Sequence, residues 1–186
     1  MALREQLEAF RPGNDQEAAD KQLLLELLDQ PKVFTRENRT GHFSASGWVV
    51  SPDRKKVLMV YHNIYDSWSW MGGHADGETD LLAVAEREIR EESGVKQLEL
   101  LSPGIFSAEI LTVDGHEKKG KYVPSHLHYN VTYLFEADPE QPLSHKPDEN
   151  SGVRWIGVEE LPQAVSEPWF TERIYSKLCK KVQNLR

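Results

Sequence analysis

Three glutamates in the stretch EREIREESG are the residues best suited to chemistry: Glu88, Glu91 and Glu92. At about 100° per residue, a helix places all three on one face. Carboxylate oxygens grouped in this way are the ligands that Mg²⁺ and similar hard cations take. The same run also allows i,i+4 ion pairs such as Glu86 with Arg90, so a solvated helix surface is the alternative.

Small electrostatic penalties favour a bound cation over that alternative. Glu88 and Glu92 are like charges at four-residue spacing, which costs about 0.2 to 0.5 kcal/mol. Glu91 and Glu92 also occupy the last helical turn, where the helix dipole disfavours anions by about 0.3 to 1 kcal/mol each. A divalent cation would reverse both effects, and the upstream pair Gly72 and Gly73 would let the backbone approach a metal or ligand closely.

The elements that must position these glutamates form an alternating α/β pattern. Alternating or apolar runs predict strands over 43–51, 55–62, 67–71, 98–101, 106–113, 126–137 and 152–158, and helices over 14–29, 80–93 and about 168–182. Asn14 is the expected N-cap of the first helix, with Glu17 completing a capping box. On the central helix, Leu82, Ala85 and Ile89 predict the stripe that faces the sheet. Helices flanking a sheet on both sides are the expected arrangement.

Composition narrows the class of protein. The chain has 186 residues, of which 39% are hydrophobic, so we expect one domain with a real core. A net charge of −8 disfavours binding to a nucleic-acid polymer but allows small phosphorylated ligands bridged by cations. No apolar run is long enough to span a membrane, and the start has no apolar signal segment. With a single cysteine, Cys179, the expected location is the cytoplasm.

The segment GHADGETDLLAVAEREIREESGV, residues 73–95, resembles the Nudix box of the Nudix hydrolases, the family that includes MutT-like enzymes. The matching positions are Gly73, Arg87, Glu88, Ile89, Glu91, Glu92, Gly94 and Val95. There is one departure from the pattern. Thr79 stands where the family has its first glutamate, and Glu78 comes one residue early. Either Glu78 or Asp80 is therefore the expected partner of Arg87.

This resemblance implies a fold and a reaction. The fold would be a Nudix-type α/β/α sandwich with a mixed β-sheet and an N-terminal helical extension. Residues 1–186 would form a single domain, with the extension over 1–35, the core over 41–161 and a C-terminal helix over 168–182. The reaction would be metal-dependent hydrolysis of the diphosphate linkage in a nucleoside diphosphate linked to another moiety, or in a related pyrophosphate.

The resemblance also assigns roles to residues. Glu88, Glu91 and Glu92 would hold Mg²⁺ or Mn²⁺, with the backbone carbonyl of Gly72 as a further ligand. The general base would be Glu88 or Glu92, with Glu149 as a third candidate. The structural positions of the box would be Gly73, Glu78, Arg87 and Gly94, of which Gly94 is also the expected helix C-cap.

Several basic residues are candidates for binding substrate phosphates. Lys119 and Lys121, with Lys118, lie in a predicted loop that contains two glycines and a proline. A solvated hairpin loop is the alternative. His126 and His128 alternate along one strand face together with Asn130, and His74 follows the glycine pair. A zinc site is not predicted, because no third ligand stands at a recognisable spacing from the paired histidines. The candidates are thus His74, Lys119, Lys121, His126 and His128.

Aromatic residues near the glycine loop allow two interpretations. Trp68, Trp70, Tyr61 and Tyr65 include rings that could stack on a base. Core packing is the commoner fate of such rings.

Two other functions are possible on the same fold. An isomerase of the isopentenyl diphosphate type would need a cysteine in the site, whereas Cys179 lies in the predicted C-terminal helix. A ligand-sensing module would typically lack some of the box carboxylates. The identity of the diphosphate substrate stays open, and the N-terminal extension could cover the site or form a homodimer.

Overall fold

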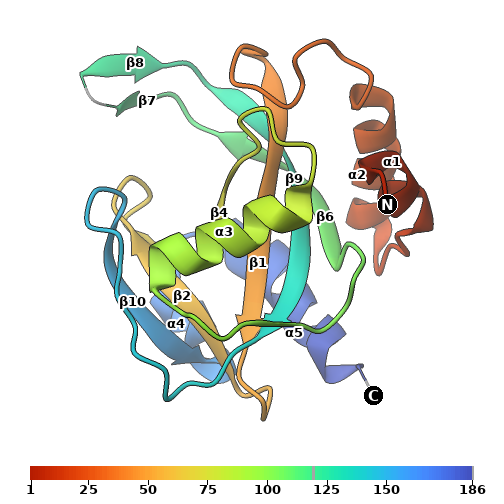
Figure 1. Ribbon diagram of the computed structural model, residues 1–186. Helices are drawn as coiled ribbons and strands as arrows, with labels where there is room; N and C mark the ends of the chain where they lie inside the picture. The colour runs from red at the N-terminus through yellow and green to blue at the C-terminus, as the bar shows by residue number, and fades with distance from the viewer. Residues whose placement is uncertain (119, 186) are drawn as a thin grey trace. The chain divides into compact units, whose positions relative to one another are not determined.

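The computed structural model describes residues 1–118 and 120–185, over which the chain is an α/β protein (Figure 1). Its helical elements are α1 (Leu3–Ala9), α2 (Asp15–Leu27), α3 (Leu81–Ser93), η1 (Val158–Glu160), α4 (Leu161–Ala164), η2 (Phe170–Tyr175) and α5 (Ser176–Gln183). Its strands are β1 (Gly41–Val50), β2 (Lys56–His62), β3 (Ser67–Ser69), β4 (Met71–His74), β5 (Glu99–Leu100), β6 (Ser107–Val113), β7 (His116–Lys118), β8 (Lys121–Val123), β9 (His126–Glu136) and β10 (Asn150–Gly157). Within the described ranges, no helix combines the length and hydropathy needed to cross a bilayer.

The sheet has β1 near its centre. Among the described residues, eight strands are hydrogen-bonded in the order β10-β2-β1-β9-β5, with β3 beside β2, β4 beside β1 and β6 beside β9. Every residue of β1 is buried, as expected for a strand covered on both faces. The strands β7 and β8 form a separate antiparallel ribbon. The predicted α/β class with a mixed sheet and N-terminal helices is therefore confirmed.

By its contacts, the described part of the chain divides into two compact units. The first comprises Met1–Ser46, Gly72–Ala85 and Gly104–Tyr133, and the second Gly47–Met71, Glu86–Pro103 and the residues from Leu134 onward. The long elements β1, β9 and α3 contribute residues to both units. The assignment of residues 1–186 to a single domain stays a prediction.

In the first unit, helix α2 lies beside strand β6 (Figure 1) and is attached to it by two carboxylates. Asn14 caps α2 as predicted, since its side-chain oxygen accepts from the backbone N–H of Glu17 at 2.9 Å. The carboxylate of Glu17 is fully buried and accepts from the hydroxyl of Ser107 at 2.6 Å. Asp20 accepts from the backbone N–H of Ile110 at 3.0 Å. The N-terminal extension is thus packed on the edge of β6 through its polar residues as well as its apolar ones.

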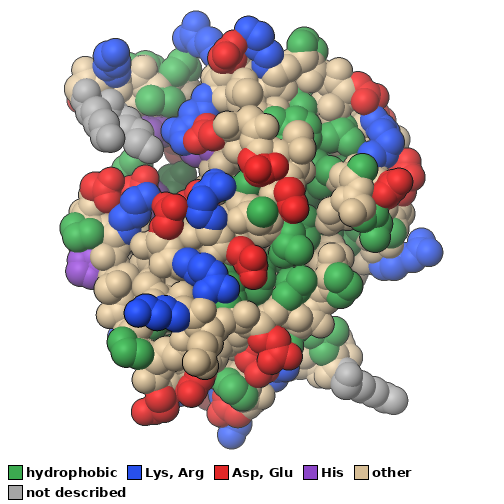
Figure 2. All heavy atoms as spheres, in the orientation of Figure 1, with side chains coloured by type: hydrophobic (Ala, Val, Ile, Leu, Met, Phe, Trp, Pro, Cys, Tyr) green, Lys and Arg blue, Asp and Glu red, His purple; other side chains and the backbone are tan. Residues whose placement is uncertain are grey.

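In the second unit, aromatic rings pack β1 and the end of β3 against the C-terminal helical segment. The ring of Trp48 stacks on Tyr175 at a centroid distance of 5.3 Å, and Trp70 meets the same tyrosine edge-on at 5.6 Å. The helix predicted over 168–182 is present as η2 and α5, which together run from Phe170 to Gln183. Acidic and basic side chains are interspersed over the face drawn in Figure 2.

Candidate active site

The packing of α3 determines which of its glutamates face water. Ile89 is fully buried against Gly47 of β1, where an added Cβ would overlap the end of the isoleucine side chain. The buried stripe of the helix consists of Leu81, Val84, Ala85 and Ile89. The prediction of Leu82 in this stripe was wrong, because Leu82 is only half-buried. The i,i+4 row that starts at Leu81 faces inward instead.

Both ends of α3 are capped by local groups. Asp80 accepts from the backbone N–H of Ala83 at 3.2 Å, as an N-cap residue does. The carboxylate of Glu78 accepts from the backbone N–H groups of Thr79 at 2.7 Å and of Asp80 at 2.9 Å. Gly94 has a φ of +73°, so the predicted left-handed C-cap is confirmed. These caps fix where the glutamate-bearing turns begin and end.

Two of the three glutamates are largely withdrawn from water. Glu92 is 5% exposed, and the side chain of Glu88 is 14% exposed, whereas the side chain of Glu91 is 47% exposed. Burial raises the pKa of Glu88, and the neighbouring guanidinium of Arg87 opposes that shift. Arg87 lies 3.1 Å from the Glu88 carboxylate, so Glu88 is a partner of Arg87 that the sequence did not predict.

The carboxylates of Glu149 and Glu91 share a lysine. The ammonium nitrogen of Lys146 lies 3.0 Å from Glu149 Oε2 and 3.4 Å from Glu91 Oε2. The hydrogen bond to Glu149 is the main reason that the pKa of Lys146 is raised. Glu149, the third candidate for the general base, is therefore linked to the exposed Glu91 by the ammonium group of Lys146.

The donor set on α3 fits a hard divalent cation. All three side chains offer carboxylate oxygens, the ligand type that Mg²⁺ and Mn²⁺ prefer. Glu88 and Glu92 hold their carboxylates away from bulk water, and burying a carboxylate is costly unless a cation or hydrogen bonds compensate it. The charge of Glu91 further raises the pKa of Glu88, so a cation placed among the three would relieve a real repulsion.

In the first unit, the glycine pair lies on β4, close against β1. An added Cβ at Gly72 would lie 2.6 Å from the carbonyl oxygen of Ala45 and 2.6 Å from the hydroxyl of Ser46. Only glycine therefore allows β4 this close approach to β1. The turn after β4 follows at Asp76 and Gly77, which have φ values of +47° and +96°. The roles of the Gly72 carbonyl and of Gly73 stay predictions.

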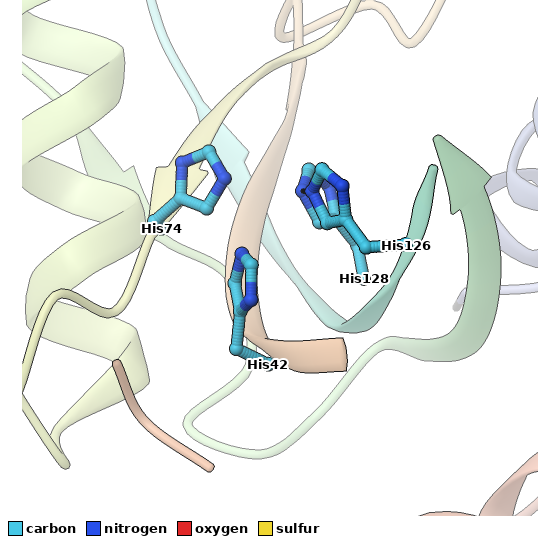
Figure 3. Close-up of side chains that lie close together, drawn as sticks. All are labelled: His42, His74, His126 and His128. Atoms are coloured by element: carbon cyan, nitrogen blue, oxygen red, sulfur yellow. Dashed lines mark hydrogen bonds between the residues drawn. The ribbon is translucent and has the colours of Figure 1, made fainter. Parts of the chain in front are cut away.

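Four histidines meet in the same unit. His42 of β1, His74 of β4, and His126 and His128 of β9 each offer one ring nitrogen, and these four atoms all lie within 4.8 Å of one another (Figure 3). The Nε2 atoms of His126 and His128 are 3.2 Å apart. The ring of His42 lies 5.0 Å from that of His74 and 5.0 Å from that of His126. We call these residues the histidine cluster.

Backbone carbonyls and burial set the protonation of the histidine cluster. His42 Nδ1 lies 3.1 Å from the carbonyl oxygen of Asn38, and His126 Nδ1 lies 2.9 Å from that of Pro124. Because a carbonyl only accepts, the Nδ1 atom of each of these rings carries a proton. Burial lowers the pKa of His42 and lowers the pKa of His128 to about 3, and neighbouring histidines add to the effect on His128. The buried rings are therefore neutral near pH 7.

Sequence reasoning found three members of the histidine cluster and missed His42. The signal was present in the alternation of His42, Ser44 and Ser46 along β1, which matches the alternation of His126, His128 and Asn130 along β9. The two strands are neighbours in the sheet, so the two polar rows meet. Spacing within one segment gave no third ligand beside His126 and His128, because the other two imidazoles come from β1 and β4. The predicted role of the histidines in binding substrate stays a prediction.

The predicted phosphate-binding lysines and the tryptophans near the glycine pair are not members of the histidine cluster. Lys121 is exposed on β8, and Lys119 lies outside the described residues. Trp70 is buried in the core, as the commoner interpretation had it. Trp68 is half-buried and lies under the guanidinium of Arg154, with 4.6 Å between the guanidinium carbon and the ring centroid.

Comparison with known proteins gives one family match over most of the chain. A family model described as the NUDIX domain matches residues 41–178. The curated relative is the RNA pyrophosphohydrolase of Pelagibacter ubique (strain HTCC1062), which is 28% identical over 144 residues. That match covers 75% of this chain and 90% of the relative.

Solved structures show the same fold. The structure of a C. elegans Ap4A hydrolase binary complex superposes with a TM-score of 0.55 at 18% sequence identity. The match covers 76% of this chain and 94% of the hydrolase. A NUDIX-family hydrolase from Clostridium perfringens gives a TM-score of 0.53 at 19% identity, covering 80% and 99%. At these identities the likeness concerns the fold, and the predicted Nudix-type fold is confirmed.

Proposed function

The chain belongs to the Nudix family of hydrolases, which act on pyrophosphate bonds, and we propose that it cleaves a nucleoside diphosphate linked to another moiety. The observation that carries the proposal is the carboxylate row of α3. Glu88 and Glu92 are withdrawn from water while Glu91 stays exposed beside them. Three carboxylates on one helix face are the donor set that a metal-dependent hydrolase needs.

In this proposal Glu88, Glu91 and Glu92 hold Mg²⁺ or Mn²⁺. When bound, the cation neutralises the diphosphate and stabilises charge on the leaving oxygen. The chain's own residues then position it. Ile89 fixes the helix on β1, and the caps at Asp80 and Gly94 fix its ends.

The reaction needs one proton acceptor. A water oxygen forms a bond to phosphorus, the bridging P–O bond breaks, and the water's proton passes to a carboxylate. Glu88 or Glu92 is the first candidate for that base. Glu149 is the alternative, because Lys146 holds its carboxylate close to Glu91. Lys121, which is exposed, would contact substrate phosphates.

The names of the relatives suggest substrates to test. One is an RNA pyrophosphohydrolase and another an Ap4A hydrolase, so a triphosphorylated RNA 5′ end and a dinucleoside polyphosphate belong beside nucleoside diphosphate sugars. The net charge of −8 favours the small molecules over a polymer. With a single cysteine the chain suits the reducing cytoplasm, where these metabolites occur.

The test is a release assay for phosphate and nucleoside monophosphate over that substrate panel with Mg²⁺ or Mn²⁺. The wild-type protein should turn over at least one substrate only when metal is present. Glu91→Gln/Glu92→Gln should lower turnover on the order of 10³-fold, because a metal site supplies several kcal/mol of transition-state stabilisation. The matched control is Glu86→Gln on the same helix, whose carboxylate pairs with Arg90 and should be dispensable.

Two outcomes would contradict the proposal. Turnover that survives in the double variant would show that Glu91 and Glu92 of α3 do not hold the catalytic metal. Silence over the whole panel, with metal binding intact, would instead favour a ligand-sensing module. An isomerase is disfavoured by Cys179, which lies on α5 and whose pKa is raised by burial to about 11, the opposite of a reactive thiol.

A further inference from the structure

We propose that the histidine cluster is a second metal site, which binds Zn²⁺ through the imidazoles of His42, His74, His126 and His128. This inference does not depend on the proposed hydrolysis, since it uses none of the α3 carboxylates. Its basis is the meeting of four ring nitrogens from three strands within 4.8 Å of one another.

The geometry is close to that of a tetrahedral site. Zn–N bonds of about 2.0 to 2.1 Å place neighbouring nitrogens roughly 3.3 Å apart around the ion. His126 Nε2 and His128 Nε2 already lie 3.2 Å apart. The rings of His74 and His128 are perpendicular to each other at a centroid distance of 4.7 Å, and Figure 3 shows the rings gathered around a common space. The four nitrogens, which lie within 4.8 Å of one another, would draw together to this spacing around a bound ion.

His42 supplies independent evidence for a ligand. It is only 4% exposed, and its Nε2 atom is buried with no hydrogen-bond partner among the described residues. Its other ring nitrogen, Nδ1, is directed to the carbonyl of Asn38. A buried polar atom without a partner costs free energy, whereas the same lone pair on a metal ion is satisfied.

The surroundings match those of metal-binding histidines. Such residues usually donate their second ring N–H to a carbonyl or carboxylate, which fixes the tautomer. His42 and His126 both do so, with the carbonyls of Asn38 and Pro124. Because burial lowers the pKa of His42, its Nε2 presents a lone pair, the form that binds a metal.

The ligand chemistry selects the ion. Four imidazoles and no carboxylate suit Zn²⁺, or Co²⁺ and Ni²⁺ in its place, and suit Mg²⁺ poorly. A closed set of four protein ligands is typical of structural zinc rather than of a catalytic ion. The bound ion would therefore cross-link β1, β4 and β9 within the first unit, including the strand that carries Gly72.

The experiment uses the full chain, stripped of metal by a chelator, in the Glu91→Gln/Glu92→Gln background so that α3 does not contribute. Co²⁺ is titrated while visible d–d absorption is followed, and Zn²⁺ is then added in competition with a chromophoric chelator. We expect an intense tetrahedral Co²⁺ spectrum, displacement by a single equivalent of Zn²⁺, and no effect of excess Mg²⁺. Zn²⁺ should also raise the melting temperature.

Substitution of the ligands decides the result. His128→Asn and His74→Asn should each weaken Zn²⁺ binding on the order of 100-fold or more, since even indirect partners of a ligand are worth 10- to 100-fold. His145→Asn is the matched control, because His145 is exposed on a loop and should leave affinity unchanged. Circular dichroism checks folding, and His74 lies on β4 whereas His128 lies on β9, so the His74 variant tests binding even where His128→Asn unfolds.

Either of two results would contradict the proposed zinc site. One is wild-type protein that binds neither Co²⁺ nor Zn²⁺. Another is Zn²⁺ affinity that is the same in the His74 and His128 variants as in the control. If His74→Asn and His128→Asn, made in the chain that keeps Glu91 and Glu92, raise only the KM for a diphosphate substrate and no metal binds, the cluster contacts substrate directly and the zinc proposal is wrong.

Discussion

Gly47→Ala tests how the fold positions the carboxylates of α3. Gly47 lies within strand β1, and an added Cβ would overlap the Cδ1 atom of Ile89 and lie 2.7 Å from its Cγ1. In an open strand, glycine to alanine would stabilise by about 0.5 to 1 kcal/mol through chain entropy. Overpacking against a fully buried isoleucine costs about 1 to 3 kcal/mol. We expect a net loss of roughly 1 to 2 kcal/mol.

A double-mutant cycle separates this clash from other effects. Ile89→Ala alone should cost about 2 to 5 kcal/mol, because it leaves a cavity under the helix. In that background Gly47→Ala has no clash and partly fills the space, so it should stabilise by about 0.5 to 1 kcal/mol. The coupling energy should therefore be roughly 2 kcal/mol, well above the error of a cycle.

Urea unfolding followed by tryptophan fluorescence measures these energies, since Trp48 is fully buried on the same strand. Gly104→Ala is the control, because nothing lies within 4 Å of an added Cβ there. Ile89 stands between Glu88 and Glu92 on the helix, so a displaced Ile89 should also lower metal-dependent turnover on the order of 10-fold or more. A coupling energy below about 0.5 kcal/mol would refute the view that Gly47 and Ile89 set the position of the carboxylates.

Three further predictions concern single side chains. Asn130→Ala should destabilise by roughly 2 to 4 kcal/mol in urea unfolding, since this fully buried amide joins four side-chain partners; an unchanged midpoint would contradict its role. Lys146→Met should strengthen Mn²⁺ binding by about 2- to 5-fold in a titration, because the lysine no longer competes for Glu91 and Glu149; weaker binding would exclude such competition. In metal-free protein, stability should fall by about 2 kcal/mol between pH 7.5 and 5, because the unfolded chain protonates His128 near pH 6.5 whereas burial lowers the folded pKa to about 3. Denaturation at several pH values should show a smaller slope in His128→Asn, and equal slopes would assign the effect elsewhere.

Local signals explain what could be predicted from the sequence. The structure confirms three features that depend on residues adjacent in the chain: the cap at Asn14, the helix end at Gly94, and the two strands on either side of the segment SPDR, residues 51–54. The carboxylate row of α3 is likewise a property of one helix. Of the predicted inward stripe, Ala85 and Ile89 are fully buried and only Leu82 was wrong, because Leu81 is also apolar and takes the buried position in the first turn. Only contact with the sheet selects between the two leucines.

Features assembled from distant segments were beyond local signals. Helix α1 is too short for its sequence to show a strong apolar periodicity, so this helix was not predicted. Its two buried leucines, Leu3 and Leu7, are covered only by other segments of the folded unit. The partner of Arg87 was sought in the loop before α3, whereas Glu88, the next residue, lies against it. The histidine cluster draws on three strands, so no spacing rule within one segment could contain it.

Within the first unit, the polar side chains of β1 and β9 form one row whose two ends differ in how their hydrogen-bonding groups are satisfied. Along β1 and β9, the serines and Asn130 satisfy one another: Asn130 accepts from Ser44 at 3.2 Å and from Ser46 at 2.9 Å. This end of the row is closed by internal hydrogen bonds and needs no ligand. Two residues along β1, His42 is as deeply buried as these serines, yet its Nε2 has no hydrogen-bond partner among the described residues, and burial keeps the neighbouring His128 neutral at pH 7. The lone pair of this Nε2 needs a donor or a metal ion, so the Zn²⁺ of the proposed site would complete this end of the row.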